Sequence, residues 1–289
     1  MRYIDLDLLV GLPEVQPLID AAEEARETIL NAPNKEIRKQ LIEEHRQNWV
    51  AFRPHFERIF GSKCWYTECK NPGTDDDVDH YRPKGRLAED PQHGGYWWEA
   101  LNWRNFRLSC HRANRLRENP ETGKTHGKGD HFPLLYETDR CRHPNDDLCR
   151  ERPTLLDPTD PSDPPLLTFD PDGNVALSPY YKDDAEAARR VEDSRLYLHL
   201  DWPAFREERQ ALYTTVYTKV LDGDQADRRF ARNETGAKET LKAIARDLIR
   251  LAGERQPYSR AAQAYILRFR DREWVKKFVL SYIPDLPGR

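Results

Sequence analysis

Residues 77–84 read DVDHYRPK, and residues 105–114 read NFRLSCHRAN. Both lie within residues 64–150, a segment rich in Gly, Pro, Asp and aromatic residues that has only short apolar runs. This composition favours a small, loop-rich unit with short strands and one functional helix. Pro83 is compatible with a strand that ends near Tyr81, because proline cannot donate a backbone hydrogen bond to a neighbouring strand.

The first stretch contains an adjacent carboxylate and imidazole, Asp79 and His80. Hydrolysis of a phosphodiester needs a nucleophilic water, a base that deprotonates it and a divalent cation that stabilises the developing negative charge. Neighbouring side chains on a strand point to opposite faces. The pair can therefore serve as base and metal ligand only if the strand end is twisted or enters a loop.

The second stretch could supply a further ligand. The amide oxygen of asparagine is a competent ligand for a hard cation such as Mg²⁺, which prefers oxygen and keeps several waters. If Ser109 caps the helix that follows, Asn114 lies on its second turn and can face back toward Asp79 and His80. Arg112 and Arg115, on another face of this helix, could then contact phosphates.

Composition and charge limit the class of protein. Of the 289 residues, 38% are hydrophobic and 33% are charged, which is typical of a very polar globular protein and not of a disordered one. No apolar run approaches the roughly 20 residues that cross a bilayer, and no signal-peptide pattern is present, so we expect a cytoplasmic protein without a membrane partner. The net charge of −4 argues against a protein that coats nucleic acid over its whole surface. Residues 82–128 nevertheless contain ten Lys or Arg against five acids.

The hydrophobic spacing predicts an α+β protein that is mostly helical. Residues 1–60 form an N-terminal helical segment, with two amphipathic helices interrupted near Ala32-Pro33. Residues 61–180 hold the two stretches above and a proline-rich strap, in which Asp172-Gly173 predicts a hairpin turn. Residues 181–289 return to helical spacing without a catalytic constellation, and we expect them to form a partner surface.

The order Asp-His, then Asn, four residues, Cys, and a terminal His or Asn on a helix resembles the HNH, or ββα-metal, nuclease motif. A closer resemblance is to the small HNH proteins of bacterial anti-phage systems, the PtuB and retron-associated group, which are encoded beside ATPases. It implies a small ββα-metal nuclease core embedded in the helical protein. It covers roughly residues 60–180 and excludes the helical C-terminal third. The blocks that carry it are Cys64 to Glu68, Asp77 to Lys84, Tyr96 to Trp98, Trp103 to Cys110, Lys128 to Leu134 and Leu155 to Pro158.

Carried onto this chain, the resemblance implies that His80 is the base that activates water. Asp79 and Asn114 would hold one catalytic divalent ion, Mg²⁺ or Mn²⁺. Asn105 would brace the loop that positions His80. His111 is the alternative to Asn114 as the terminal residue of the motif.

Basic residues in and near these blocks are candidates for contacts with nucleic acid. They are Arg82, Lys84, Arg112, Arg115 and Lys128. Lys128 and Asp130 fall in the downstream block of the family, and Glu151 falls in its Glu-x-Pro segment, but the resemblance assigns these three no firm role.

Many HNH proteins also carry a structural zinc on two Cys-x-x-Cys pairs, since four thiolates satisfy tetrahedral Zn²⁺. This chain has Thr67 and Ala113 where the second cysteine of each pair would fall. We therefore expect no structural zinc, with Cys64 and Cys110 as buried remnants. The alternative is a rearranged site that uses Cys64, Cys69, Cys110 and either Cys141 or Cys149.

Together, the motifs and the local positive charge predict a metal-dependent endonuclease that cleaves nucleic acid. We expect DNA in preference to RNA, and a role as the effector of an anti-phage system with an ATPase partner. Two alternatives stay open. One is an RNA nuclease of the same type, for example on tRNA, and the other is a non-catalytic module that binds nucleic acid or docks on a partner.

Overall fold

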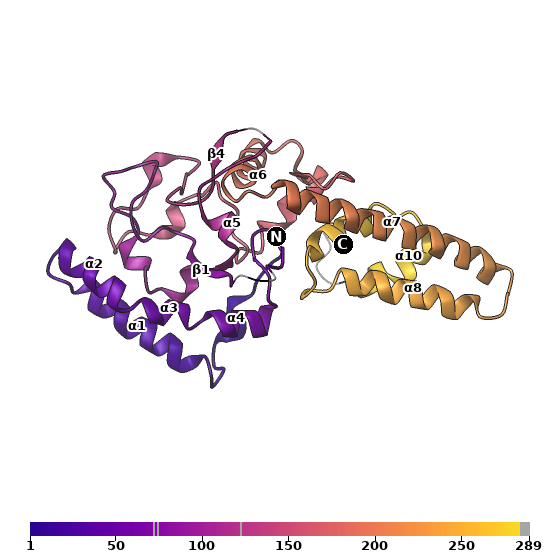
Figure 1. Cartoon of the computed structure of the whole chain (residues 1–289), viewed down its shortest axis with the longest axis horizontal. Helices are drawn as coiled ribbons and strands as arrows, with labels where there is room; N and C mark the ends of the chain where they lie inside the picture. Colours follow the sequence, from indigo (N-terminus) through magenta and orange to yellow (C-terminus); the bar gives the residue numbers. More distant parts are fainter. Residues whose placement is uncertain (72, 74, 122, 284–289) are drawn as a thin grey trace.

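The computed structural model describes residues 1–71, 73, 75–121 and 123–283. The architecture is α+β and mostly helical, as the spacing predicted. Helices lie at both ends of the chain, and among the described residues the central part contains three antiparallel two-stranded sheets. Figure 1 shows the N-terminal helices at one end of the molecule, the short strands in the middle and a long helical hairpin at the other end.

Four short or medium helices form the N-terminal segment after a 3-10 turn at Leu6–Leu9. They are α1 (Gln16–Leu30), α2 (Lys35–Glu44), α3 (Arg46–Val50) and α4 (Arg53–Phe60). The predicted interruption near Ala32 is confirmed, because Asn34 caps α2 by accepting a hydrogen bond from the Ile37 N–H at 2.9 Å. The prediction of one continuous second helix was wrong. Pro54 lies in the first turn of α4, where its missing N–H is tolerated and favours a new helix start.

The stretches at residues 77–84 and 105–114 contain paired strands followed by a short helix. Strand β1 (Asp77–His80) pairs antiparallel with β2 (Phe106–Ser109), with His80 opposite Phe106, and α5 (His111–Asn114) packs against β1. The predicted Ser109 cap was wrong. Cys110 is the cap residue, and its Sγ accepts a hydrogen bond from the Ala113 N–H at 3.4 Å. Because α5 ends at Asn114, this residue lies at the end of the helix and not on a second turn.

Two further hairpins complete the central part. One joins β3 (Arg117–Glu118) to β4 (Thr125–His126). The other joins β5 (Leu167–Phe169) to β6 (Val175–Leu177) through Gly173, whose φ of 83° favours glycine. The turn predicted at Asp172-Gly173 is therefore confirmed.

The C-terminal region begins with α6 (Ala185–Tyr197) and continues with α7 (Pro203–Ala231), α8 (Ala237–Leu251), α9 (Ser259–Leu267) and α10 (Glu273–Phe278). It is described as far as residue 283, so the last six residues of the predicted region lie outside the description. Helices α7 and α8 run side by side as a hairpin that extends away from the central part (Figure 1). Among the helices described, none has the length and apolar character needed to cross a membrane.

The β1–β2 sheet lies between two apolar cores. Phe106 and Leu108 of β2 join the core of the N-terminal helices, where Phe56 and Trp65 also pack. Cys110, just after β2, belongs to the core that extends through the C-terminal helices. The paired strands are therefore fixed from both sides by packing.

Gly223 of α7 gives a test of this packing. A Cβ at this position would lie 2.2 Å from Cζ2 of the buried Trp274, whose Nε1–H donates to Asp224 Oδ1 at 2.8 Å. Glycine to alanine in a helix normally stabilises by about 1 kcal/mol. Here we expect Gly223→Ala to lower the free energy of unfolding by about 1–3 kcal/mol, because α10 must move. Urea unfolding measures the change, and Asp222→Ala, at an exposed position of the same helix, should cost nothing. A more stable Gly223→Ala protein would contradict this packing.

Candidate functional site

His80 lies at the end of β1 with only 5% of its surface exposed. Its Nε2 is 2.8 Å from the Ala100 carbonyl oxygen, and because a carbonyl only accepts, Nε2 carries the proton. Nδ1 is then the basic nitrogen, and it lies 3.4 Å from Lys84 Nζ. Burial first, and then the nearby Lys84 charge, hold the pKa of His80 well below its usual range. The imidazole is therefore neutral at physiological pH and has one nitrogen able to accept a proton.

Asn105 ties together the two segments that fix His80. Its Oδ1 accepts from the Arg82 N–H at 2.8 Å, and its Nδ2 donates to the Arg82 carbonyl at 3.0 Å and to the Glu99 carbonyl at 3.2 Å. Arg82 follows His80 by two residues, and Glu99 precedes Ala100, which accepts the His80 hydrogen bond. The side chain is thus in the position that a brace for the His80 loop requires.

Asp79 is buried, and both of its carboxylate oxygens have donors within the protein. Oδ2 accepts from the Tyr66 hydroxyl at 2.9 Å, and Oδ1 accepts from Lys128 Nζ at 2.8 Å. Burial, followed by the Asp79 charge, raises the pKa of Tyr66 well above its usual range, so that the hydroxyl stays protonated and donates. Each carboxylate oxygen retains a further lone pair for a cation.

Asn114 contacts a second carboxylate that the sequence reasoning missed. Its Nδ2 donates to Asp77 Oδ2 at 3.2 Å, which leaves Oδ1 as the atom able to bind a cation. His111 Nε2 lies 3.3 Å from Asp77 Oδ1, so both alternatives for the terminal residue of the motif contact Asp77. Asp77 is two residues before Asp79 on β1, and this spacing, which puts both carboxylates on one face of the strand, was the available signal.

A pocket of about 280 Å³ brings several of the predicted residues together. Its polar lining consists of Asp79, His80, Lys84, Arg86, Asn114, Lys128 and Asp130. With His80 neutral, this lining has three cations and two anions. The pocket therefore favours an anionic ligand such as a phosphate.

The donor set suits a hard divalent cation but supplies few ligands. Asp79 and Asn114 each offer oxygen, which Mg²⁺ and Mn²⁺ prefer. Within the described part of the chain, no group of three or more His, Cys, Asp or Glu side chains is placed to hold a metal ion. A cation bound by Asp79 and Asn114 would take its other ligands from water and from substrate oxygens.

Three of the arginine and lysine residues predicted to contact nucleic acid lie outside this pocket. Arg82 points away from it, because its Nε donates to the buried Glu151 at 2.9 Å, so as placed here it supports the fold and not a phosphate. The Arg112 guanidinium lies 4.5 Å from the centre of the Trp202 ring. Arg115 is exposed, 3.6 Å from Asp77 Oδ2, and could reach a backbone at the pocket edge. Lys84 and Lys128 line the pocket itself.

Glu151 lies in a buried hydrogen-bond network outside the pocket. Its Oε1 accepts from the Tyr96 hydroxyl at 2.6 Å and from the Cys141 N–H at 2.9 Å, while Arg82 binds Oε2. Asp130, in contrast, lies at the pocket, where its Oδ2 is 3.4 Å from Arg86 Nε. Of the residues without a predicted role, Asp130 and Lys128 are therefore at the site and Glu151 is not.

Three of the five cysteines lie close together. Cys64, Cys69 and Cys110 are buried around Thr67, whose Oγ1 lies 3.1 Å from Cys69 Sγ and 3.9 Å from Cys110 Sγ. Cys64 Sγ accepts from the Thr67 N–H at 3.5 Å. Neither candidate for a fourth thiol joins them: Cys141 lies in a separate apolar cluster, and Cys149 is exposed.

Comparison with known proteins shows a distant similarity. No family model matches the chain. The chain is similar to the Septu protein PtuB of Bacillus mycoides (strain KBAB4), with 27% identity over 175 residues. The similarity covers 58% of this chain and 53% of the relative, so the chain spans about half the length of the protein it matches.

The role of Asn105 as a brace can be tested through stability. Asn105→Asp replaces a donor by a charged acceptor that faces the carbonyls of Arg82 and Glu99. We expect the free energy of unfolding to fall by about 2–3 kcal/mol, the cost of buried carbonyls that lose their donor and meet a charge. Chemical denaturation measures this loss. Asn31→Asp is the matched control, because Asn31 also donates to a carbonyl but is exposed, and it should change stability by less than about 1 kcal/mol. Equal effects at both positions would count against the brace.

Proposed function

We propose that this protein is a metal-dependent endonuclease that hydrolyses phosphodiester bonds in DNA, with His80 as its general base. The observation that carries the proposal is the hydrogen bond from Nε2–H of His80 to the Ala100 carbonyl. It leaves Nδ1 unprotonated in a pocket whose net charge is positive. The order of β1, β2 and α5, with Asp79 and Asn114 at the same pocket, supports the same assignment.

The residues act in a defined sequence when a phosphodiester enters. The phosphate attracts the Lys84 ammonium, for which no carboxylate partner occurs among the ion pairs of the described residues, and this frees Nδ1 of His80. Nδ1 then removes a proton from the attacking water. Asp79 and Asn114 would hold the divalent cation, which would supply stabilisation of the charge that develops on the phosphoryl and leaving oxygens. Asn105 keeps the imidazole aligned throughout.

The similarity to the Septu protein PtuB supports a role in anti-phage defence. We include in the proposal an ATPase partner that controls the nuclease, as the resemblance to the anti-phage HNH proteins implies. The α7–α8 hairpin is suited to this contact, because it extends from the central part and contributes no residue to the pocket. Co-expression with an ATPase encoded beside the gene, followed by comparison of cleavage with and without it, tests this part of the proposal.

Substitution of the base is the direct test of the chemistry. His80→Ala should reduce cleavage with Mg²⁺ or Mn²⁺ on the order of 10²–10⁴-fold, because the attacking water loses its proton acceptor. Plasmid DNA and tRNA, each incubated with protein in the presence and absence of the partner, measure cleavage and identify the substrate. His143→Ala, at an exposed position, should leave it unchanged, and EDTA should stop it in every sample. Cleavage that persists in folded His80→Ala protein would exclude His80 as the base.

The cationic lining makes a separate prediction for binding. Lys84→Met should weaken binding of duplex DNA and reduce the slope of log K against log salt by about one, as expected when one phosphate contact is lost. Fluorescence anisotropy over a range of salt concentrations measures the slope. Lys238→Met removes the same charge from the exposed surface of α8 and should leave the slope intact. An unchanged slope in Lys84→Met would show that Lys84 does not contact phosphate.

A further inference from the structure

Lys128 is the least accessible cation at the pocket, with 1% of its surface exposed. Its Nζ is 2.8 Å from Asp79 Oδ1 and 2.6 Å from the carbonyl oxygen of His80. A buried ammonium is costly unless acceptors surround it. Here the acceptors are the carboxylate assigned to the metal and the main chain of the residue assigned as base.

The segment that carries Lys128 is fixed on both sides. Before it, Gly127 packs so closely that a Cβ would lie 2.3 Å from the Arg115 carbonyl oxygen. After it, the Gly129 N–H donates to the Asn114 carbonyl at 3.0 Å. The ammonium is therefore held against Asp79 by the chain, not only by its own charge.

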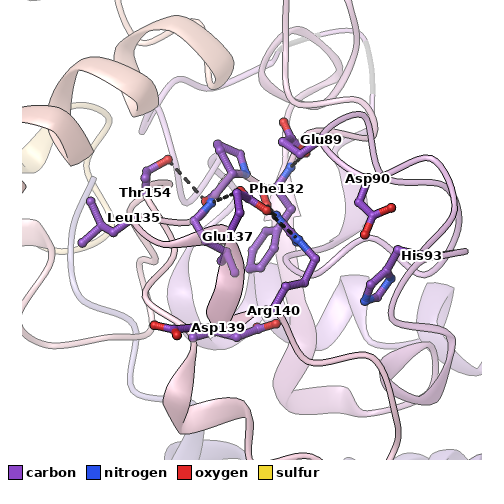
Figure 2. Close-up of polar contacts among 12 residues, drawn as sticks. Glu89, Asp90, His93, Phe132, Leu135, Glu137, Asp139, Arg140 and Thr154 are labelled. Carbon is purple, nitrogen blue, oxygen red and sulfur yellow. Dashed lines mark hydrogen bonds and ion pairs between the residues drawn. The ribbon is translucent and has the colours of Figure 1, made fainter.

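Further along, Phe132 is anchored from two directions, as Figure 2 shows. Its N–H donates to Glu89 Oε2 at 2.9 Å, and its carbonyl accepts from the Arg140 guanidinium at 2.9 Å. Arg140 is itself paired with Glu137. These contacts restrain the chain four residues after Lys128 and so limit how far the Lys128 segment can move.

The charges at the pocket have a consequence for metal binding. Lys128 neutralises Asp79, Asp130 pairs with Arg86, and Lys84 leaves the lining with a net positive charge. A divalent cation at Asp79 would meet an ammonium that already binds the same carboxylate, and it would find few other protein ligands. A substrate phosphate supplies both the missing negative charge and the missing oxygen ligands.

We propose that Lys128 is a positioning residue that keeps Asp79 closed to a divalent cation until a substrate phosphate occupies the pocket. This inference rests on the proposed function. With Lys128 in this role, metal and nucleic acid bind cooperatively, and the protein without nucleic acid does not bind the metal at Asp79. The reactive centre is thereby assembled only on substrate.

Binding of Mn²⁺ tests the proposal without any cleavage. The whole protein with His80→Ala, which does not turn over, is titrated with Mn²⁺ and free Mn²⁺ is followed by electron paramagnetic resonance. Titrations are made without DNA and with a short duplex, after subtraction of Mn²⁺ bound by the duplex alone. The same titrations are made with proteins that carry a second substitution beside His80→Ala. These substitutions are Lys128→Met, Lys128→Gln, which keeps a donor but no charge, and Lys238→Met as the control of equal charge.

Without DNA, we expect the two Lys128 variants to bind Mn²⁺ more tightly than the parent, on the order of tenfold or more, because a like charge beside the ion is gone. The gain in affinity on adding duplex should shrink in these variants and stay unchanged in Lys238→Met. A role limited to support of Asp79 predicts the opposite, a loss of affinity. Circular dichroism verifies that each variant is folded.

Unchanged or weaker Mn²⁺ binding in both folded Lys128 variants would overturn the inference, and so would the absence of Mn²⁺ binding in every protein. These outcomes differ from failure of the proposed function. That failure appears in the cleavage assay, as no cleavage by the wild-type chain or as cleavage without His80. A tighter Mn²⁺ site in Lys128→Met would support the inference whether or not the substrate has been found.

Discussion

Pairing of β1 with β2 sets the geometry on which the candidate site depends. The pairing puts His80 opposite Phe106, the residue that follows Asn105 in the sequence. The segment between the two strands brings the Ala100 carbonyl to the His80 imidazole. The sheet is only two short strands, and an isolated pair of this kind is marginal in water. It is stable here because one core packs on Phe106 and Leu108 and another on Cys110. The geometry of the candidate site is thus supported mainly by packing from helices far away in the sequence.

Two ion pairs fix the position of the proline-rich strap. Arg107 binds Asp157 through two nitrogens at 2.7 and 2.6 Å, and Arg190 binds Asp163 through two nitrogens at 2.6 and 2.7 Å. The first joins the strap to β2, and the second joins it to α6. Buried pairs of this kind add little net stability, but a wrong arrangement would leave a charge without its partner. Some of the many charged residues in the sequence therefore connect segments inside the protein, and not all of them belong to the solvated surface.

The sequence predicted the features that depend on local patterns. The break before Asn34 and the hairpin at Gly173 are of this kind, because capping and turn residues act over a few positions. The cap at Ser109 was predicted wrongly, since the sulfur of Cys110 takes the role one residue later. Local signals thus predicted the presence of helices and turns better than the residue at which each one begins.

Contacts between distant residues could not be read in this way. Lys128 meets Asp79 across 49 positions, and Arg82 turns to Glu151 across 69. No periodicity or motif encodes which of several basic residues will face a pocket and which will be needed inside. Asp77 was visible as a neighbour of Asp79 on the same face of a strand, but its contact with Asn114 depends on where a one-turn helix is placed.

That helix, α5, has consequences for how this kind of site can be separated from its protein. A single turn lies far below the length at which a helix is stable alone. Asn114 has its orientation only because β1, the Gly129 backbone and the Cys110 cap hold the turn in place. The arrangement of the motif residues thus depends on the complete tertiary structure. A peptide that contained residues 77–114 would carry the residues of the motif but not their arrangement, and a graft of the motif into another protein would have to bring the surrounding cores with it.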